Sequence, residues 1–203
     1  MSTLTISNYT LKHFDLKAKA IMDEYLNLIN VDVSDYTFAG NYIWLSTATG
    51  FYTIVNETFC LFILNSGELT MLLPPIGKKE NTYDAMIQCF EIMNSHNSNR
   101  NYSKIEYVHE ELLEGFVDYL EEGTLVYEML KDFIIEKKLV DYIYKVEDLI
   151  DLKGDSYKSK RNEINRFRNV YPNHKIEILD KEKHGSAVMA LFNKWVRDRT
   201  TYM

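Results

Sequence analysis

The stretch FYTIVNETFCLFILNSGELTMLL, residues 51–73, decides the fold of this chain. It reads as three short strands, Phe51 to Val55, Thr58 to Leu64 and Leu69 to Leu73, joined by Asn56-Glu57 and by Asn65-Ser66-Gly67. Connections of this length and composition are typical of hairpins, so the sequence predicts an antiparallel meander. The middle strand is apolar on both faces, which predicts helices on both sides of the sheet.

Helical patterns surround the meander. Asp15 can cap a helix that runs to about Ile29, with an apolar stripe of Leu16, Ala20, Ile21, Tyr25, Leu28 and Ile29. A second, shorter helix is expected from Phe38 to Leu45, opened by Ser34 or Asp35. A third should begin at Asn81 or Thr82, because Met86, Cys89, Phe90 and Met93 follow at helical spacing.

The chain then returns to the sheet. Pro74-Pro75-Ile76-Gly77 stops the third strand, and a strand is expected from Lys104 to Val108 after the helix. Strand, helix and strand in this order form a parallel crossover in nearly all cases. A further amphipathic helix with Leu112, Leu113, Phe116, Val117 and Leu120 follows, and strands near Leu130 to Glu136 and Val140 to Val146 would close the sheet. The predicted fold is a mixed α/β sheet, and its element order resembles the GCN5-related N-acetyltransferase (GNAT-like) fold.

A different pattern begins after Gly154. A basic helix from Ser156 to about Tyr171 ends at Pro172, Lys175 to Leu179 reads as a strand, and Lys181 to Arg197 as a helix. We interpret these parts as an acetyltransferase-like domain over residues 1–153, a linker helix over 154–173, and the first strand and helix of a truncated second copy over 174–203. The apolar face of the last helix, from Val188 to Trp195, should be exposed and could drive self-association.

The composition is that of a globular protein without a membrane-spanning segment. The chain has 203 residues, of which 46% are hydrophobic, and its longest apolar runs are far too short to cross a bilayer. No signal peptide is recognisable at the start, so a cytoplasmic protein is expected. Cys60 and Cys89 are isolated, which suits two buried thiols better than a disulfide framework.

Charge is unevenly distributed around a net value of −7. Residues 110–155 hold 14 acidic and five basic residues, whereas residues 157–168 hold five basic residues and only Glu163 as an acid. This asymmetry between an acidic body and a basic segment is worth testing as a sign of binding, and ordinary solvated surface charge is the alternative.

Four ordered motifs carry a family resemblance: SDYTFAGNYIW at 34–44, LPPIG at 73–77, YIYKVEDL at 142–149 and KSKRNEINRF at 158–167. Together they resemble the phosphatidylglycerol lysyltransferase C-terminal domain family. The resemblance implies two tandem acetyltransferase-like domains joined by a long helix, and transfer of an aminoacyl group from aminoacyl-tRNA. The chain departs from the family pattern because it has no membrane-spanning region and lacks most of the second domain.

The basic helix is the first candidate site. Tyr157, Ile164, Phe167 and Tyr171 share one face at 3.6 residues per turn, and cationic and amide side chains lie beside them. The predicted anion-binding residues here are Lys158, Lys160, Arg161, Asn165, Arg166 and Arg168. They could meet the phosphates of tRNA or of another nucleotide-containing donor; a linker helix with a solvated flank is the alternative.

Two further candidates are a loop and an aromatic cluster. Lys78 and Lys79 follow Pro74-Pro75-Ile76-Gly77 and could meet an anion, but the prolines offer no N–H groups to cradle a pyrophosphate. A plain strand-to-helix turn is the alternative. Aromatic side chains at Tyr36, Phe38, Tyr42 and Trp44 could wall a substrate pocket or belong to the core.

No motif in the sequence identifies a catalytic residue, and no spacing of His and Cys predicts a metal site. Transfer from an activated ester needs positioning and electrostatic stabilisation more than a covalent intermediate. Three functions stay open: an acyl or aminoacyl transferase using aminoacyl-tRNA, a non-catalytic binding module derived from a truncated transferase, and an N-acetyltransferase using acyl-CoA. No cofactor beyond such a donor is predicted.

Overall fold

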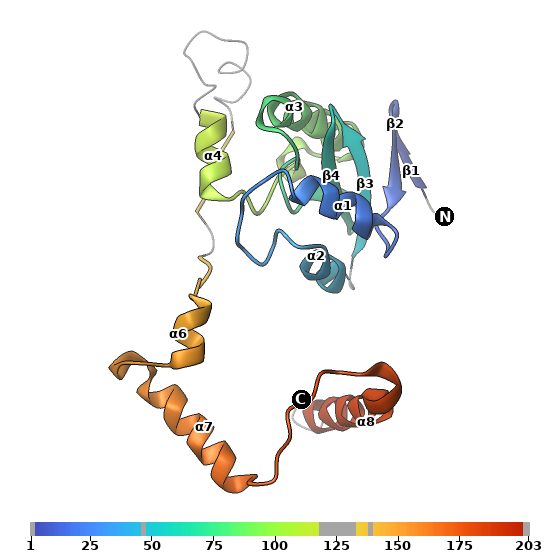
Figure 1. Cartoon of the computed structure of the whole chain (residues 1–203). Helices are drawn as coiled ribbons and strands as arrows, with labels where there is room; N and C mark the ends of the chain where they lie inside the picture. The colour runs from blue at the N-terminus through green and yellow to red at the C-terminus, as the bar shows by residue number, and fades with distance from the viewer. Residues whose placement is uncertain (1–2, 46–47, 118–132, 138–139, 201–203) are drawn as a thin grey trace. The chain divides into compact units, whose positions relative to one another are not determined.

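The computed structural model describes residues 3–45, 48–117, 133–137 and 140–200. The chain divides into two compact units, residues 1–143 and residues 144–203, and each is described by itself. Figure 1 shows the strands and the helices α1 to α4 of the first unit, and the helices α6 to α8 of the second.

Five antiparallel strands form the sheet of the first unit in sequence order. They are β1 (Thr3–Ile6), β2 (Tyr9–His13), β3 (Thr49–Val55), β4 (Thr58–Asn65) and β5 (Glu68–Met71). The last three are the predicted meander, with bounds within three residues of those expected.

Both meander turns use left-handed backbone. Asn56 and Glu57 have φ of 45° and 57°, and the next turn places Ser66 and Gly67 at 53° and 87°. Positive φ at both central residues matches the twist of two-residue hairpins. The turn residues therefore fix the register that pairs Val55 with Thr58.

The hairpin of β1 and β2 was not predicted from the sequence. Its strands are only four and five residues long, and they alternate between exposed and buried side chains. Ile6 and Leu11 supply its buried contacts, and β2 joins the sheet through Lys12 and His13 opposite Tyr52 and Phe51. Such short runs fall below what hydrophobic periodicity can detect.

The parallel crossover is confirmed, but the regular strand expected from Lys104 to Val108 is wrong, because this segment joins β5 through a single bridge only. The helix α3 (Lys79–His96) and a single 3₁₀ turn at Arg100–Tyr102 separate β5 from a segment that returns beside it. The Met71 amide donates to the Lys104 carbonyl at 2.9 Å, and the Glu106 amide donates to the Met71 carbonyl at 3.0 Å. The resulting parallel bridge joins Met71 and Ile105.

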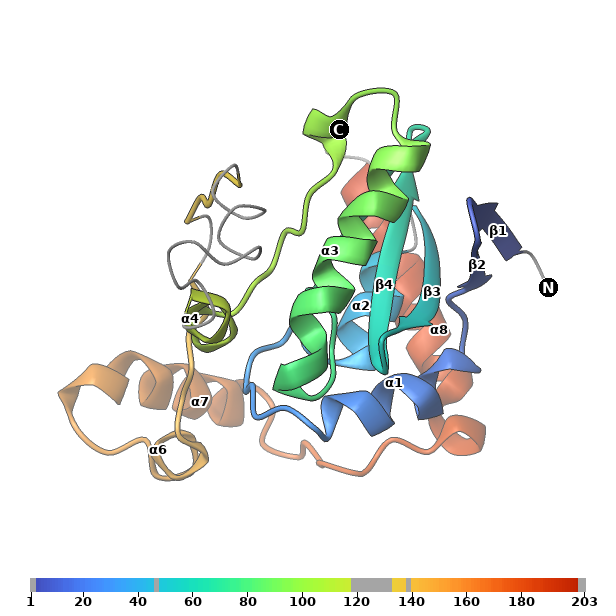
Figure 2. The same cartoon turned by 90° about the horizontal axis from the view of Figure 1, so that it is seen from above.

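Helices cover both faces of the sheet, as the apolar middle strand predicted (Figure 2). Cys60 and Phe62 of β4 pack with Cys89 and Met93 of α3, whereas Phe59 and Leu61 point to the opposite face. That second face is covered from α1 (Ala18–Leu26) and α2 (Phe38–Trp44). Unit 1 is thus a mixed α/β layer structure consistent with a GNAT-like fold.

Several predicted helix details are wrong. In α1 the fully buried residues are Ala18 and Met22, while Leu16 and Ala20 of the predicted stripe are exposed. Asp15 accepts a hydrogen bond from the Lys17 amide in the turn before the helix, so α1 starts later than expected.

Helix caps also differ from the prediction. Thr37 caps α2, because its Oγ1 accepts from the Gly40 amide at 3.0 Å, while the Ser34 carbonyl is used by the Thr37 hydroxyl. The helix α3 begins at Lys79, so Asn81 and Thr82 lie within its first turn. The buried residues of α3 include Met86, Cys89 and Met93, as predicted.

The last helix described in the first unit is α4 (Glu110–Val117). The second unit contains α6 (Val146–Asp151), a 3₁₀ turn at Asp155–Tyr157, α7 (Lys158–Val170) and α8 (Lys181–Thr200). The predicted basic helix and the last helix are confirmed. The expected helical residue Leu120 lies outside the described residues.

Three further strand predictions are wrong for the part of the chain that the structure describes. Residues 133–137, 140–145 and 174–180 have no regular secondary structure, and residues 130–132 and 138–139 lie outside the described residues. Ile176 and Ile178 are 93% and 94% exposed. A strand requires a partner to satisfy its backbone and cover its apolar face, and the described residues offer none to these segments.

Candidate functional site

A pocket lies where α3 begins. It has a volume of about 270 Å³ and is lined by four segments. They are residues 28–31 after α1, the loop residues Pro75 and Gly77, the first turn of α3 with Lys79 and Thr82, and the first turn of α4 with Glu111 and Leu112. Most of this wall is apolar, and its charged side chains, Lys79 and Glu111, are exposed.

The floor of the pocket is the loop that follows β5. Ile76 pairs with Phe59, since each amide donates to the other's carbonyl at 2.8 to 2.9 Å. Gly77 passes so close to β4 that a Cβ would lie 2.9 Å from Thr58 Cγ2 and 3.1 Å from the Glu57 carbonyl, which favours glycine at this position. The loop is therefore fixed against the sheet by its own backbone.

This fixed loop presents few amide donors to a ligand. Pro74 and Pro75 have no N–H group, both are buried, and the Ile76 amide is already bonded to Phe59. Lys78 and Lys79 follow as exposed side chains. Residues 74–76 therefore offer no free backbone amide to a pyrophosphate, and the pocket also contains the start of α3 with Lys79.

Tyr36 holds the opposite end of the crossover segment in place. Its side chain is 6% exposed, its hydroxyl donates to the Tyr107 carbonyl at 2.8 Å, and it accepts from the His109 amide at 3.1 Å. Burial raises the pKa of Tyr36 far above its ordinary value, so the hydroxyl stays protonated. Because α4 begins directly after His109, Tyr36 also positions the wall formed by Glu111 and Leu112.

The other predicted aromatic pocket residues lie in different environments. Phe38 is buried in the core, whereas Tyr42 and Trp44 are 41% and 80% exposed. Phe38 and Tyr42 stack with ring centres 5.5 Å apart. None of these aromatics lines the pocket at the start of α3 or the hollow at residues 167–174.

The predicted cations of α7 divide into two groups. Arg161 donates through Nη1 to the carbonyls of Leu152 and Gly154, the latter at 2.7 Å, and Lys160 forms an ion pair with Glu163 at 3.3 Å. Lys158, Arg166 and Arg168 are exposed and form no ion pair with any residue that the structure describes. Asn165 is exposed too.

Arg161 and Lys160 thus form contacts within their own part of the chain. Arg161 connects α7 to the turn after α6, where Leu152 and Gly154 have φ of 48° and 87°. At 3.6 residues per turn, Arg168 lies on the same side of α7 as Ile164, four residues earlier, whereas Arg166 lies about 160° from Arg168 around the helix axis. Lys158, Arg166 and Arg168 are called here the exposed cations of α7, and they do not share one face of the helix.

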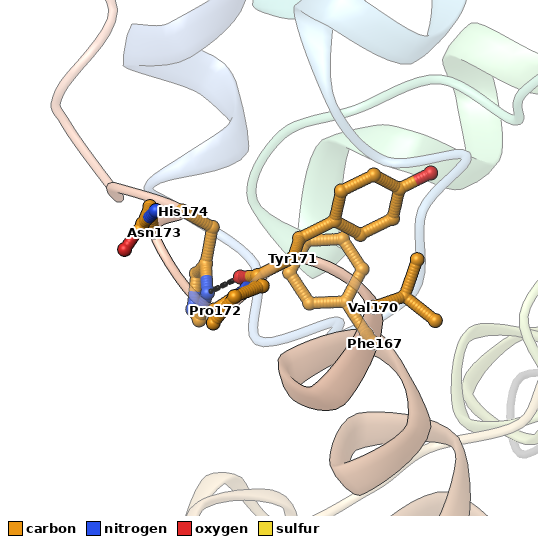
Figure 3. Close-up of a pocket in the computed structure, with 6 residues that line it drawn as sticks. All are labelled: Phe167, Val170, Tyr171, Pro172, Asn173 and His174. Atoms are coloured by element: carbon orange, nitrogen blue, oxygen red, sulfur yellow. Dashed lines mark hydrogen bonds between the residues drawn. The ribbon is translucent and has the colours of Figure 1, made fainter.

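A second hollow lies at the end of α7 (Figure 3). It is open, about 490 Å³ in volume, and lined by Phe167, Val170, Tyr171, Pro172, Asn173 and His174. His174 Nδ1 lies 2.7 Å from the Tyr171 carbonyl, which closes the turn after the helix. The rings of Phe167 and Tyr171 are 5.1 Å apart and stand beside this turn. The hollow is apolar and adjoins the last turn of the basic helix.

No group of three or more His, Cys, Asp or Glu side chains that could hold a metal ion occurs among the described residues. Both cysteines are buried and unpaired by a disulfide, and burial raises the pKa of the Cys89 thiol well above its ordinary value. A protonated, buried thiol is a poor nucleophile, so Cys89 is a core residue.

Sequence reasoning located the loop after β5 and the basic helix, but it missed three features of the site. The wall at residues 28–31 is irregular in the structure, whereas the sequence had placed Leu28 and Ile29 in the apolar stripe of the first helix. The role of Tyr36 depends on a contact with residues 71 and 73 positions away in the sequence. The Glu111 side chain was treated only as a favourable charge at a helix start.

None of the helices among the described residues combines the length and apolar character needed to cross a membrane. No curated protein and no solved structure matches the chain. A model of the family described as phosphatidylglycerol lysyltransferase, C-terminal, matches residues 26–202. That match includes the pocket at the start of α3, the Tyr36 contacts and the basic helix. The chain therefore belongs to the phosphatidylglycerol lysyltransferase C-terminal family, whose name indicates an acyl or aminoacyl transferase-type domain.

Proposed function

We propose that this chain takes part in aminoacyl transfer with aminoacyl-tRNA as the donor, and that α7 contacts the tRNA backbone. The observation that carries the proposal is the set of exposed cations on α7, Lys158, Arg166 and Arg168, in a member of this family. These three exposed cations have no carboxylate partner among the described residues. Exposed cations without a carboxylate partner favour phosphate contacts and release of counterions.

The transfer itself needs few protein groups. An acceptor amine or hydroxyl attacks the ester carbonyl of the aminoacyl group, the new acyl bond forms, and the ester C–O bond to the tRNA breaks. The proton of the acceptor goes to the departing 3′ oxygen. Because the ester is already activated, positioning and stabilisation of the oxyanion can supply the rate enhancement. A reaction of this kind does not require a catalytic side chain, and no motif in the sequence of this chain identifies one.

Filter binding of aminoacyl-tRNA to the full chain tests the proposal. We expect Arg166→Ala and Arg168→Ala each to weaken binding several-fold, because each removes a phosphate contact. Lys160→Ala is the matched control, since Lys160 is on the same helix but already paired with Glu163. Binding that is equally strong in wild type and in both arginine variants would refute the assignment.

Transfer activity is measured separately with a radiolabelled aminoacyl group and a small amine acceptor. Appearance of the label on the acceptor, faster than spontaneous hydrolysis of the ester, is the expected result. Label released only as the free amino acid at the spontaneous rate would contradict a catalytic role for this chain.

The acyl-CoA alternative has less support. A CoA pyrophosphate is normally met by free amides before a helix, and here two prolines and a bonded Ile76 amide occupy that position. We expect no rise in melting temperature with micromolar acetyl-CoA. A clear rise would favour an N-acetyltransferase instead.

A binding module without catalysis is the second candidate function, and one observation favours it. Val188, Leu191, Phe192 and Trp195 on α8 are between 45% and 69% exposed. Apolar side chains gathered along one helix are typical of an interaction surface. Under this alternative the chain would bind a partner and the transfer assay would stay at background.

A further inference from the structure

We propose that the hollow at the end of α7 binds an unpaired nucleobase, which stacks on the exposed rings of Phe167 and Tyr171. The inference rests on the proposed function, because the base belongs to the same nucleic acid whose phosphates the cations of α7 contact. It adds two properties that those cations do not provide, namely a contact with a base and a preference among bases. The hollow and α7 both lie within residues 144–203.

The rings at this hollow are held in place and remain accessible (Figure 3). Phe167 and Tyr171 are 49% and 57% exposed, although the Phe167 ring centre lies 5.1 Å from that of Tyr171 and 5.1 Å from that of His174. The Tyr171 amide donates to the Phe167 carbonyl at 2.8 Å, so both rings extend from the last turn of α7. Exposed aromatic rings of this kind are the surfaces on which proteins stack the bases of single-stranded RNA.

The shape of the hollow suits a flat ligand that keeps one side in solvent. The hollow is open and has a volume of about 490 Å³. A closed cavity of about 150 Å³ holds a benzene molecule, so a single base fits here while its sugar and phosphates stay outside. Val170 and Pro172 complete the lining with apolar surface.

Cations lie on both sides of this apolar lining. At about 100° per residue, Arg168 lies about 60° from Tyr171 around the helix axis, and Arg166 lies about 40° from Val170. Both arginines are exposed and form no ion pair with a residue that the structure describes. A nucleotide within a strand has one phosphate on each side of its base. The charge around the hollow therefore complements a nucleotide and not an uncharged apolar ligand.

His174 offers a polar contact to the edge of the base. A carbonyl can only accept, so the His174 Nδ1 atom, 2.7 Å from the Tyr171 carbonyl, carries the hydrogen. In the neutral ring Nε2 is then an acceptor, and it forms no hydrogen bond with any described residue. The amino group of cytosine complements this acceptor, whereas uracil presents a carbonyl oxygen at the same position. We therefore expect cytosine to bind more tightly than uracil.

Fluorescence anisotropy of the full chain with labelled ribo-oligonucleotides tests the proposal. The probes are oligocytidylate, oligouridylate and an abasic oligonucleotide of the same length, which has the same phosphates but no bases. Oligocytidylate should bind about fivefold or more tightly than the abasic probe, because stacking adds to the phosphate contacts. It should bind about threefold more tightly than oligouridylate, because one neutral hydrogen bond is gained.

Variants localise the binding. Phe167→Leu and Tyr171→Leu keep an apolar side chain but remove the ring, so each should weaken oligocytidylate about fivefold and leave the abasic probe unchanged. Tyr171→Phe should bind like wild type. Tyr144→Leu is the matched control, because Tyr144 is 56% exposed and lies outside the hollow. His174→Asn keeps a donor for the Tyr171 carbonyl and should abolish the preference for oligocytidylate over oligouridylate.

Equal affinity of wild type for oligocytidylate and the abasic probe would overturn the inference, and so would equal losses in Phe167→Leu and Tyr144→Leu. Binding to vesicles of phosphatidylserine and phosphatidylcholine that Phe167→Leu leaves unchanged, without any preference for bases, would overturn it in favour of a lipid surface.

The phosphate contacts of the proposed function are measured separately by the abasic probe. Arg166→Ala and Arg168→Ala should weaken the abasic probe and oligocytidylate by the same factor, because both probes have the same phosphates. If these variants bind the abasic probe like wild type but still prefer oligocytidylate, the hollow is supported and the role of the cations is refuted.

Discussion

Two backbone groups, the Tyr107 carbonyl and the His109 amide, depend on the hydroxyl of Tyr36. Tyr36→Phe keeps the ring but leaves both groups without that partner in a buried place. We expect the free energy of unfolding to fall by about 1 to 3 kcal/mol. Urea denaturation measures it, with Tyr42→Phe as the control because Tyr42 is exposed. An unchanged stability in Tyr36→Phe would contradict the positioning role.

The same hydroxyl predicts a dependence on alkaline pH. Burial is the largest cause that raises the pKa of Tyr36, so the folded protein retains this proton at a pH where the unfolded chain, with a pKa near 10, loses it. Its contribution to stability is complete below about pH 10 and is lost as the pH rises further. Between pH 9 and pH 11, wild type should lose more stability than Tyr36→Phe; equal losses would show that Tyr36 is not the group responsible.

Arg161 shows how a residue predicted to bind an anion can be used inside the fold. Its guanidinium donates to two carbonyls in the turn before α7. Arg161→Ala should lower the thermal stability of the helices in residues 144–203, by about 1 kcal/mol, because charged hydrogen bonds are lost at a partly exposed place. Circular dichroism measures this, and Lys160→Ala should have almost no effect. Similar losses in both variants would contradict a specific clamp.

At the scale of elements, the crossover should be visible in hydrogen exchange. The amides of Glu106 and Tyr107 donate to the carbonyls of Met71 and Leu72 at 3.0 and 2.8 Å, so both should exchange slowly. Amides of residues 175–179 have no regular structure and should exchange quickly. Rapid exchange at Glu106 would contradict the crossover, and slow exchange at residues 175–179 would restore the predicted strand.

The exposed apolar face of α8 makes a second prediction at this scale. The chain has two tryptophans, and Trp195 is 52% exposed. In a Trp44→Phe variant, Trp195 fluorescence should resemble that of a hydrated indole in dilute solution and shift to shorter wavelength as self-association covers the face. Leu191→Glu should abolish the shift. Emission that does not change with concentration would contradict self-association through α8.

Elements with strong local signals were predictable. The meander followed from its turns and its doubly apolar middle strand, and α7 followed from a dense run of cations with a spaced aromatic face. The strands expected at residues 130–136, 140–146 and 175–179 have the right composition, but composition does not supply a pairing partner. The described parts of these segments are irregular for that reason.

At the scale of the whole molecule, the segments that form the site could be predicted from the sequence, but their arrangement in space could not. The loop after β5 was recognised from its prolines, yet its pocket also needs residues 28–31 and Glu111, which only the folded sheet brings near. Likewise, the sequence showed six polar residues on α7 and could not separate the engaged Arg161 and Lys160 from the unpaired Lys158, Arg166 and Arg168. Such distinctions depend on tertiary contacts and on side-chain geometry.

The central claim, that the exposed cations of α7 contact the phosphates of a tRNA donor, is tested most directly by the salt dependence of binding. The logarithm of the affinity for aminoacyl-tRNA should fall linearly with the logarithm of salt concentration. In the Lys158→Ala, Arg166→Ala, Arg168→Ala triple variant the slope should be shallower by about two to three, because three phosphate contacts are lost. A flat response in wild type, or the same slope in both proteins, would contradict the claim.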